Sequence, residues 1–237
     1  MKKLKATVPT AALFCLCLAG CSGGDNDSGA SRSLEQAKAQ LSSQQKAAAQ
    51  TAQTYQKMDN AALLQKLVEQ STAHREPFNS LAYRELRGRK DIDADALTSV
   101  IRETNNGNAL LPLLLLRRLN EKAYSDLPAA LRATVLTGAL QNSTTFNTWG
   151  LPHLYLEDAS KAMLESGSSA APALRQMLAE TRPAPLFGGQ QFMEYKRYNY
   201  RLCDYALFFL EKVQGNANFI MPVSVADRDT LIAEMSK

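Results

Sequence analysis

Residues 109–119 read Ala-Leu-Leu-Pro-Leu-Leu-Leu-Leu-Arg-Arg-Leu. This run is far shorter than the roughly 20 apolar residues that a membrane-spanning helix needs. A helix that is apolar on every side is expected to lie inside a protein core. The run therefore predicts a buried helix within a larger helical domain.

Helix signals repeat on both sides of this run, as N-cap residues, prolines at helix starts and Asn or Gly at helix ends. The residues that open these helices are Asp59 or Asn60, Pro77, Asp93, Pro128 and Ser224. Three of these helices are expected to end at Gly88, Thr104 and Leu140. Further helices are expected over 154–166, 170–180, 192–214 and 225–236. No hairpin signal or sustained period-two alternation appears. The predicted fold class is all-α, in one domain over 59–237.

Several of the helical segments share a spaced pattern. Leu81-x-x-Arg84-x-Leu86 returns 33 residues later as Leu114-x-x-Arg117-x-Leu119, and further copies begin at Ala159 and Arg201. The pattern resembles degenerate HEAT repeats over about residues 59–214. The resemblance implies a HEAT-like α-solenoid of paired helices. A multi-helix array of another kind would show the same apolar spacing, so both architectures stay open.

The N-terminal segment has the features of an export signal. Residues 1–5 are basic, and the apolar stretch 6–20 is too short for a permanent membrane helix. The stretch ends in Leu18-Ala19-Gly20-Cys21, which resembles the lipobox of bacterial lipoproteins. The resemblance implies that residues 1–20 are removed as a signal peptide and that Cys21 is lipidated. An ordinary secretory signal with a chance cysteine is the alternative.

The lipobox resemblance also implies a location. Acyl chains on Cys21 would hold the protein on a lipid bilayer, at about 0.8 kcal/mol per buried CH₂. Ser22 follows the cysteine where an Asp would favour retention in the inner membrane, by resemblance to enterobacterial sorting. The predicted location is the bacterial cell envelope, with the protein anchored in the outer membrane and facing the periplasm.

Two segments separate this anchor from the helical domain. Residues 22–33 are polar and rich in Gly and Ser, so Cys21 and this segment, 21–33, are expected to form a flexible linker. Residues 34–58 are rich in Gln and Ala, which favour helix, and Ser33 is a candidate N-cap. The segment is expected to be a mostly helical stalk, with a coiled coil as the alternative.

Removal of the signal changes the charge and the cysteine content. The chain has 27 basic and 23 acidic residues, and the loss of three lysines leaves a net charge near +1. This balance gives no broad basic face, so nucleic acid is not an expected partner. Cys15 and Cys17 leave with the signal, and lipidation would occupy Cys21. Cys203 alone remains, which excludes an intrachain disulfide and predicts a buried thiol in an apolar helix.

The sequence contains no recognised catalytic or nucleotide-binding motif. The two histidines, His74 and His153, are far apart, and no metal-ligand spacing appears. Asp91, Asp93 and Asp95 resemble half of a calcium loop, but the required Gly and terminal Glu are missing. Capping of the following helix is the favoured interpretation of these aspartates. No metal and no cofactor are predicted.

Two segments interrupt the helical pattern and supply the candidate binding residues. Segment 142–153 holds the only tryptophan, a residue favoured at binding hot spots. Segment 182–201 alternates tyrosines with basic residues, a pattern that can bind sugars, peptides or anionic groups. Packing in the core is the alternative for the tryptophan and for much of the tyrosine stripe. The candidate binding residues are Trp149, His153, Arg197, Tyr198 and Arg201.

The leading hypothesis for function is a periplasm-facing lipoprotein that acts as a protein- or peptide-binding scaffold. A toxin-immunity lipoprotein is a narrower form of the same hypothesis. The alternative of a different class is an envelope enzyme acting on cell-wall or glycan material, and the sequence leaves enzymatic activity open. Clustering of His153, Glu194 and Asp204 in one deep cleft would favour the enzyme.

Overall fold

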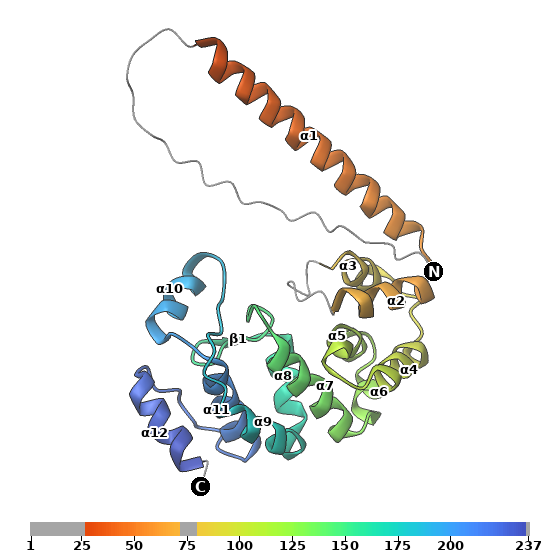
Figure 1. Cartoon of the computed structure of the whole chain (residues 1–237). Coiled ribbons are helices and arrows are strands. Elements are labelled where there is room, and N and C mark those ends of the chain that lie inside the picture. Colours follow the sequence, from red (N-terminus) through yellow and green to blue (C-terminus); the bar gives the residue numbers. More distant parts are fainter. Residues whose placement is uncertain (1–26, 72–79, 236–237) are drawn as a thin grey trace, which may run out of the picture. The chain divides into compact units, whose positions relative to one another are not determined.

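A computed structural model of the chain describes residues 27–71 and 80–235. The predicted signal peptide, 1–20, together with Cys21 and Pro77, lies outside these residues. The described residues are mostly helical, which confirms the predicted all-α class (Figure 1). Among them, no helix combines the length and the apolar character that crossing a bilayer requires. The chain divides into two compact units, residues 1–48 and 49–237.

Helix α1 (Asp27–Lys57) covers nearly all of the predicted stalk, and its first part belongs to the first unit. It begins at Asp27, so residues 27–33 are helical where a flexible linker was predicted. Once the Ala- and Gln-rich segment has nucleated a helix, extending it through a few polar residues costs little. Every side chain from Glu35 to Thr51 is exposed, including Leu41, so α1 buries no apolar face there.

The second unit contains the end of α1 and the remaining helices. In chain order these are α2 (Asn60–Ser71), α3 (Leu81–Gly88), α4 (Ala94–Thr104), α5 (Leu110–Leu119), α6 (Glu121–Asp126), α7 (Ala129–Asn142), α8 (Asp158–Glu165), α9 (Ala171–Met177), α10 (Gly189–Tyr198), α11 (Leu202–Val213) and α12 (Val225–Met235). The 3₁₀ turns η2 (Gly107–Ala109) and η3 (Gly167–Ala170) precede α5 and α9. Strands β1 (Gly150–Leu151) and β2 (Tyr155–Leu156) are short.

Helix α5 lies at the centre of contacts among the first helices of this unit. Every residue from Leu110 to Leu116 is buried, as the leucine run predicted. Helix α5 contacts α2, α3, α4, α6, α7 and α8, and α11 contacts α8, α9 and α12 further along the chain. Burial of each leucine contributes about 1.5–3 kcal/mol. Since contacts join helices that are near neighbours in the chain, the unit is a multi-helix array.

The helix ends follow the predicted capping residues. The Asp59 carboxylate accepts a hydrogen bond from the Ala62 amide at 2.7 Å, and Asp93 accepts one from the Asp95 amide at 2.9 Å. Asn105 ends α4 in the left-handed conformation, with φ 42°. The predicted starts at Asp59 and Asp93, and the predicted end of α4, are confirmed. Asp93 is therefore a helix cap, as the sequence favoured over a calcium loop.

The segment 150–156 departs from the prediction. The helix expected over 154–166 begins only at Asp158, because β1 and β2 pair as an antiparallel hairpin with Gly150 opposite Leu156. The expectation that no hairpin is present is therefore wrong here. Gly150 has φ +77°, and a Cβ at this position would lie 2.6 Å from the Tyr155 carbonyl oxygen. Only glycine meets both constraints without strain.

The single helix predicted over 192–214 is also wrong, because two helices, α10 and α11, occupy this region. Asn199 takes the left-handed conformation, φ 51°, and ends α10. Arg201 then pairs with Pro183 in an isolated bridge, and its amide donates to the Asp204 carboxylate at 2.8 Å, which starts α11. The apolar spacing continues across the break, so periodicity alone did not reveal it.

Candidate functional site

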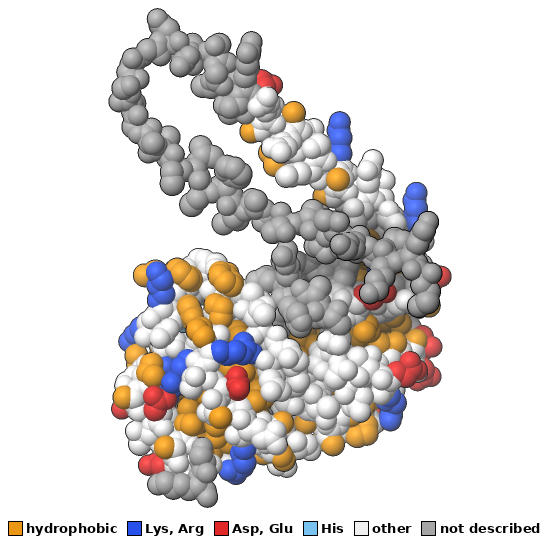
Figure 2. Space-filling view, in the orientation of Figure 1, with side chains coloured by type: hydrophobic (Ala, Val, Ile, Leu, Met, Phe, Trp, Pro, Cys, Tyr) orange, Lys and Arg blue, Asp and Glu red, His pale blue; other side chains and the backbone are white. Residues whose placement is uncertain are grey.

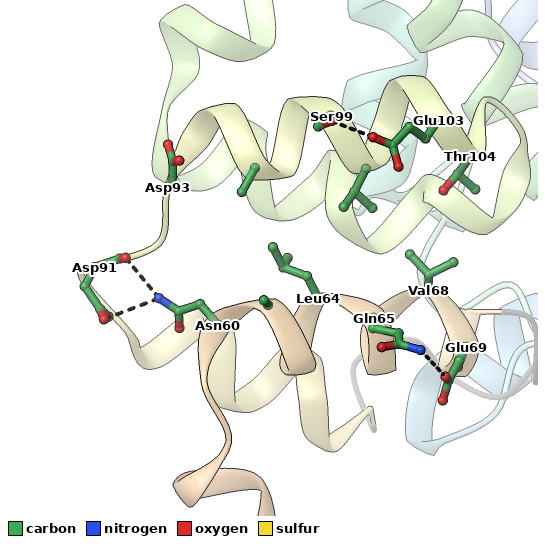
Figure 3. A pocket seen from close by; sticks show the side chains of 13 residues that line it. Asn60, Leu64, Gln65, Val68, Glu69, Asp91, Asp93, Ser99, Glu103 and Thr104 are labelled. Carbon is green, nitrogen blue, oxygen red and sulfur yellow. Dashed lines mark hydrogen bonds between the residues drawn. The ribbon is translucent and has the colours of Figure 1, made fainter.

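A groove of about 690 Å³ opens between α2 and α4 (Figure 3). Its volume lies within the range of small-molecule and peptide side-chain sites. The floor consists of small and branched apolar side chains from both helices, so it offers surface that an apolar ligand can bury. The floor residues are Ala61, Leu64, Val68, Ala96 and Val100.

Carboxylates surround this floor, and no Lys or Arg is among the described residues that line the groove. The four acidic lining residues are Glu69, Asp91, Asp93 and Glu103. Three of them accept hydrogen bonds from neutral neighbours that also line the groove. Asn60 Nδ2 donates to the Asp91 carbonyl oxygen at 3.0 Å, Ser99 Oγ donates to Glu103 at 2.7 Å, and Gln65 Nε2 donates to Glu69 at 3.3 Å.

Arg89 Nη1 donates to Asn60 Oδ1 at 2.9 Å, and Lys66 Nζ lies 2.6 Å from Glu69 Oε2. The Lys66–Glu69 pair is an exposed contact one turn apart on α2, so salt and a competing ligand weaken it readily. The groove therefore combines an apolar floor with a negative edge. We expect this arrangement to favour an apolar ligand that carries positive charge on its flanks.

None of the five candidate binding residues predicted from the sequence lines the groove. No protein-family model, curated protein or solved structure matches this chain. The spacing of Leu64 and Val68 was visible in the sequence, but it indicated a core face. In the structure Leu63, Leu64 and Leu67 are buried in the core, while Val68 is half-buried at the groove.

Trp149 lies in the core. Its side chain is 1% exposed, its ring packs against Phe209 with centroids 5.9 Å apart, and its Nε1 donates to Ser143 Oγ at 2.9 Å. A side chain in this position presents no surface to a partner. The structure therefore supports the packing interpretation of Trp149, because its indole N–H and its apolar ring are both used within the domain.

His153 and Tyr198 do come together. The two rings stack with centroids 3.7 Å apart, and His153 Nδ1 lies 2.9 Å from Tyr200 Oη. His153 Nε2 lies 3.2 Å from Glu194 Oε2, and Arg197 Nη1 lies 3.9 Å from the same oxygen. Arg197 is exposed, but the His153 side chain is only 9% exposed. This cluster fastens α10 to the loop of the β1–β2 hairpin.

Burial lowers the pKa of His153 from its usual 6.5, and this effect outweighs the nearby Glu194 carboxylate, which acts to raise the pKa. The folded protein therefore binds the His153 proton less tightly than the unfolded chain does. The free energy of unfolding should fall as pH drops below 6.5, and this loss should be complete once pH lies below the lowered pKa.

We expect a His153→Gln variant to lose this part of the pH dependence. Urea unfolding followed by circular dichroism between pH 7.5 and 5 would measure it in both proteins. Subtracting the two curves removes the contribution of the carboxylates, which both proteins share. Parallel curves over this range would contradict the assignment to His153.

Arg201 belongs to a separate ion-pair network. Its guanidinium lies 2.9 Å from Asp204 and 2.6 Å from Asp229, and only 15% of its side chain is exposed. Asp204 is fully buried and also contacts Arg228 at 3.0 Å. His153 and Glu194 are thus in contact, but the carboxylate of Asp204 faces these arginines. His153, Glu194 and Asp204, whose clustering in one cleft would favour an enzyme, therefore do not form one acid–base group.

The Cys203 thiol and the possible metal-ligating side chains do not form a reactive site. Cys203 is 1% exposed, as predicted, and burial raises the pKa of its thiol to about 11. At neutral pH such a thiol is protonated and reacts slowly. Among residues 27–71 and 80–235, no three His, Cys, Asp or Glu side chains are placed to hold a metal ion together.

Proposed function

We propose that this protein is a lipid-anchored bacterial lipoprotein that faces the periplasm and binds a protein or peptide partner in the groove between α2 and α4. The groove carries the binding part of the proposal, because it exposes an apolar floor ringed by four carboxylates. The Leu-Ala-Gly-Cys sequence ending at Cys21 supports the anchor, and the preceding Lys-rich and apolar segments support export.

The groove chemistry narrows the class of partner. Two parallel sets of small apolar side chains on neighbouring helices suit an amphipathic helix that inserts residues at i, i+3, i+4 and i+7. The carboxylates at both edges would attract Lys or Arg on the flanks of that helix and repel acidic sequences. We therefore propose that the partner presents a cationic amphipathic segment. A toxin held inactive by an immunity lipoprotein could supply such a segment.

A pair of synthetic peptides tests the groove. One peptide has leucines at i, i+3, i+4 and i+7 with lysines on its flanks, and the other has glutamates in place of these lysines. The lysine peptide should bind the chain from residue 21 onward, and the glutamate peptide should bind at least tenfold more weakly by isothermal titration calorimetry. The double replacement Glu69→Lys/Glu103→Lys should reverse this order, because it changes the sign of two edge charges.

Two exposed glutamates outside the groove supply the matched control. The replacement Glu35→Lys/Glu234→Lys makes the same change in net charge, so it separates local complementarity from long-range attraction. Equal effects of the two double replacements would contradict a binding role for the groove. With the native partner, repeated pull-downs from detergent-solubilised membranes that recover no specific protein would count equally against it.

The anchor has its own test. Cys21→Ser should abolish incorporation of labelled palmitate and move the protein from the membrane fraction to the soluble fraction, because the thioether bond to lipid needs the thiol. The Cys203→Ser chain is the control, since that thiol is buried in α11. Labelling that persists in the Cys21→Ser chain would show that the lipobox assignment is wrong without affecting the groove.

A further inference from the structure

Helix α10 carries a second surface, on elements that do not line the groove. At about 100° per residue, Phe192, Met193, Lys196 and Arg197 fall on one half of the helix. Met193 is 67% exposed and the Arg197 side chain is 63% exposed. The opposite half carries Tyr198, which is buried. The outward half of α10 is thus apolar and basic.

Two exposed apolar side chains next to α10 enlarge this face. Phe187, in the loop before the helix, is 54% exposed, and Leu154, in the hairpin loop, is 60% exposed. Leu154 follows His153, which stacks on Tyr198 of α10. Figure 2 shows hydrophobic and basic side chains gathered over the region of α10. We call Leu154, Phe187, Phe192, Met193, Lys196 and Arg197 the α10 surface.

The charge on the α10 surface has one sign. Its basic residues are Lys196 and Arg197, and helix α10 contains one acidic residue, Glu194. The Glu194 carboxylate lies 3.2 Å from His153 Nε2 and 3.9 Å from Arg197 Nη1, and its side chain is 35% exposed. Lys196 Nζ lies 4.7 Å from the centre of the Phe192 ring, so cation and aromatic ring are side by side.

Hydrogen bonds from the rest of the domain hold α10 and the loop before it in place. The Tyr198 carbonyl oxygen accepts a hydrogen bond from the buried guanidinium of Arg228 at 2.7 Å. The preceding loop is fixed as well, because Asn147 donates to the Phe187 carbonyl oxygen at 2.7 Å and accepts from the Phe187 amide at 3.1 Å. The domain therefore presents the α10 surface in one defined shape.

We propose that the α10 surface is a membrane contact, with its apolar side chains in the boundary between headgroups and acyl chains and its cations on the phosphates of anionic phospholipids. Exposed aromatic and aliphatic side chains beside Lys and Arg are typical of such interfacial helices. A two-fold contact between two copies would bring Lys196 and Arg197 of each copy close to the same residues of the other. A bilayer with anionic lipid meets the same side chains without that repulsion.

Vesicle flotation tests the proposal without the acyl anchor. The protein is the chain from residue 21 onward with Cys21→Ser, which retains every residue that the structure describes. At low ionic strength it should float with phosphatidylcholine vesicles that contain 30% phosphatidylglycerol, at least tenfold more than with pure phosphatidylcholine. High salt should release it, because the attraction is screened. No flotation with the anionic vesicles, or equal flotation with both, would overturn the proposal.

Two variants separate the apolar and the electrostatic contributions to vesicle binding. Phe192→Ser/Met193→Ser and Lys196→Gln/Arg197→Gln should each reduce flotation at least fivefold while circular dichroism shows the same helical content. If the serine variant fails to fold, the glutamine variant, whose side chains lie in solvent, still decides the outcome. Unchanged flotation of the glutamine variant would overturn the proposal.

The control removes two exposed apolar side chains elsewhere. Leu119 is 39% exposed at the end of α5 and Ile220 is 83% exposed before α12. Leu119→Ser/Ile220→Ser should leave flotation unchanged. A loss equal to that of the α10 variants would overturn the assignment to α10. Concentration-dependent self-association that the Phe192→Ser/Met193→Ser variant abolishes would likewise overturn it, in favour of a contact between copies.

Discussion

Arg228→Met is expected to lower the free energy of unfolding by about 3–5 kcal/mol. Arg228 is fully buried, and its guanidinium donates to the carbonyl oxygens of Pro222, Val223 and Tyr198 at 2.7–2.9 Å. Its Nε also lies 3.0 Å from the buried Asp204 carboxylate. Methionine keeps the apolar stem but leaves these acceptors without a donor and removes one of the two cations beside Asp204.

Urea unfolding followed by circular dichroism would measure this loss. Arg102→Met is the matched control, because Arg102 is exposed on α4 and its replacement should change the free energy by no more than about 0.5 kcal/mol. Asp204→Asn and the double variant complete a cycle, in which coupling of about 0.5–3 kcal/mol would show that the two side chains stabilise one another. A loss below about 1 kcal/mol for Arg228→Met would contradict this account.

Trp149→Ala should also cost about 3–5 kcal/mol of unfolding free energy. The replacement leaves a cavity beside Phe209 and removes the donor to Ser143. Packing beside Phe209 cannot fully relax into that space, because buried helices on several sides hold it open. Since Trp149 is the only tryptophan, circular dichroism rather than intrinsic fluorescence must follow the unfolding of the variant.

This measurement also separates the two interpretations of Trp149 that the sequence left open. A recognition residue on the surface would lose binding with little change in stability, whereas a core residue loses stability. Trp149→Phe should retain more than half of the stability lost in the alanine variant, because it fills most of the cavity and loses only the indole N–H. A change below about 1 kcal/mol for Trp149→Ala would restore the recognition interpretation.

Much of the fold was predictable because its signals are local. The leucine run of α5 and the caps at Asp59 and Asp93 each depend on residues within a few positions of one another. The break at Asn199 was not predictable in this way, because the apolar spacing continues through it. The hairpin after Gly150 has a similar cause: its pairing needs only two residues in each strand, too few to produce an alternating pattern.

The groove was harder to predict than the helices that form it. Ala61 and Ala96 lie on separate helices, and the distance between those helices depends on how α2 and α4 pack together. Helical spacing tells which face of each helix is apolar, but it does not tell whether that face is filled. Conversely, tryptophan and arginine are common at binding sites, which made Trp149 and Arg201 candidates. The packing that uses both side chains within the protein could not be predicted from the sequence.

Helix α10 is fixed before it meets any ligand, by the His153–Tyr198 stack and by the Arg228 hydrogen bond to the Tyr198 carbonyl oxygen. Ordering a mobile helix and its side chains on association lowers affinity, by about 0.5–1.5 kcal/mol for each immobilised rotamer-rich side chain. A backbone already in place avoids the backbone part of that entropy loss, so only the exposed side chains remain to be ordered. A handful of exposed side chains can then give measurable affinity, and weakening the Arg228 contact should reduce that affinity even though Arg228 lies far inside the protein.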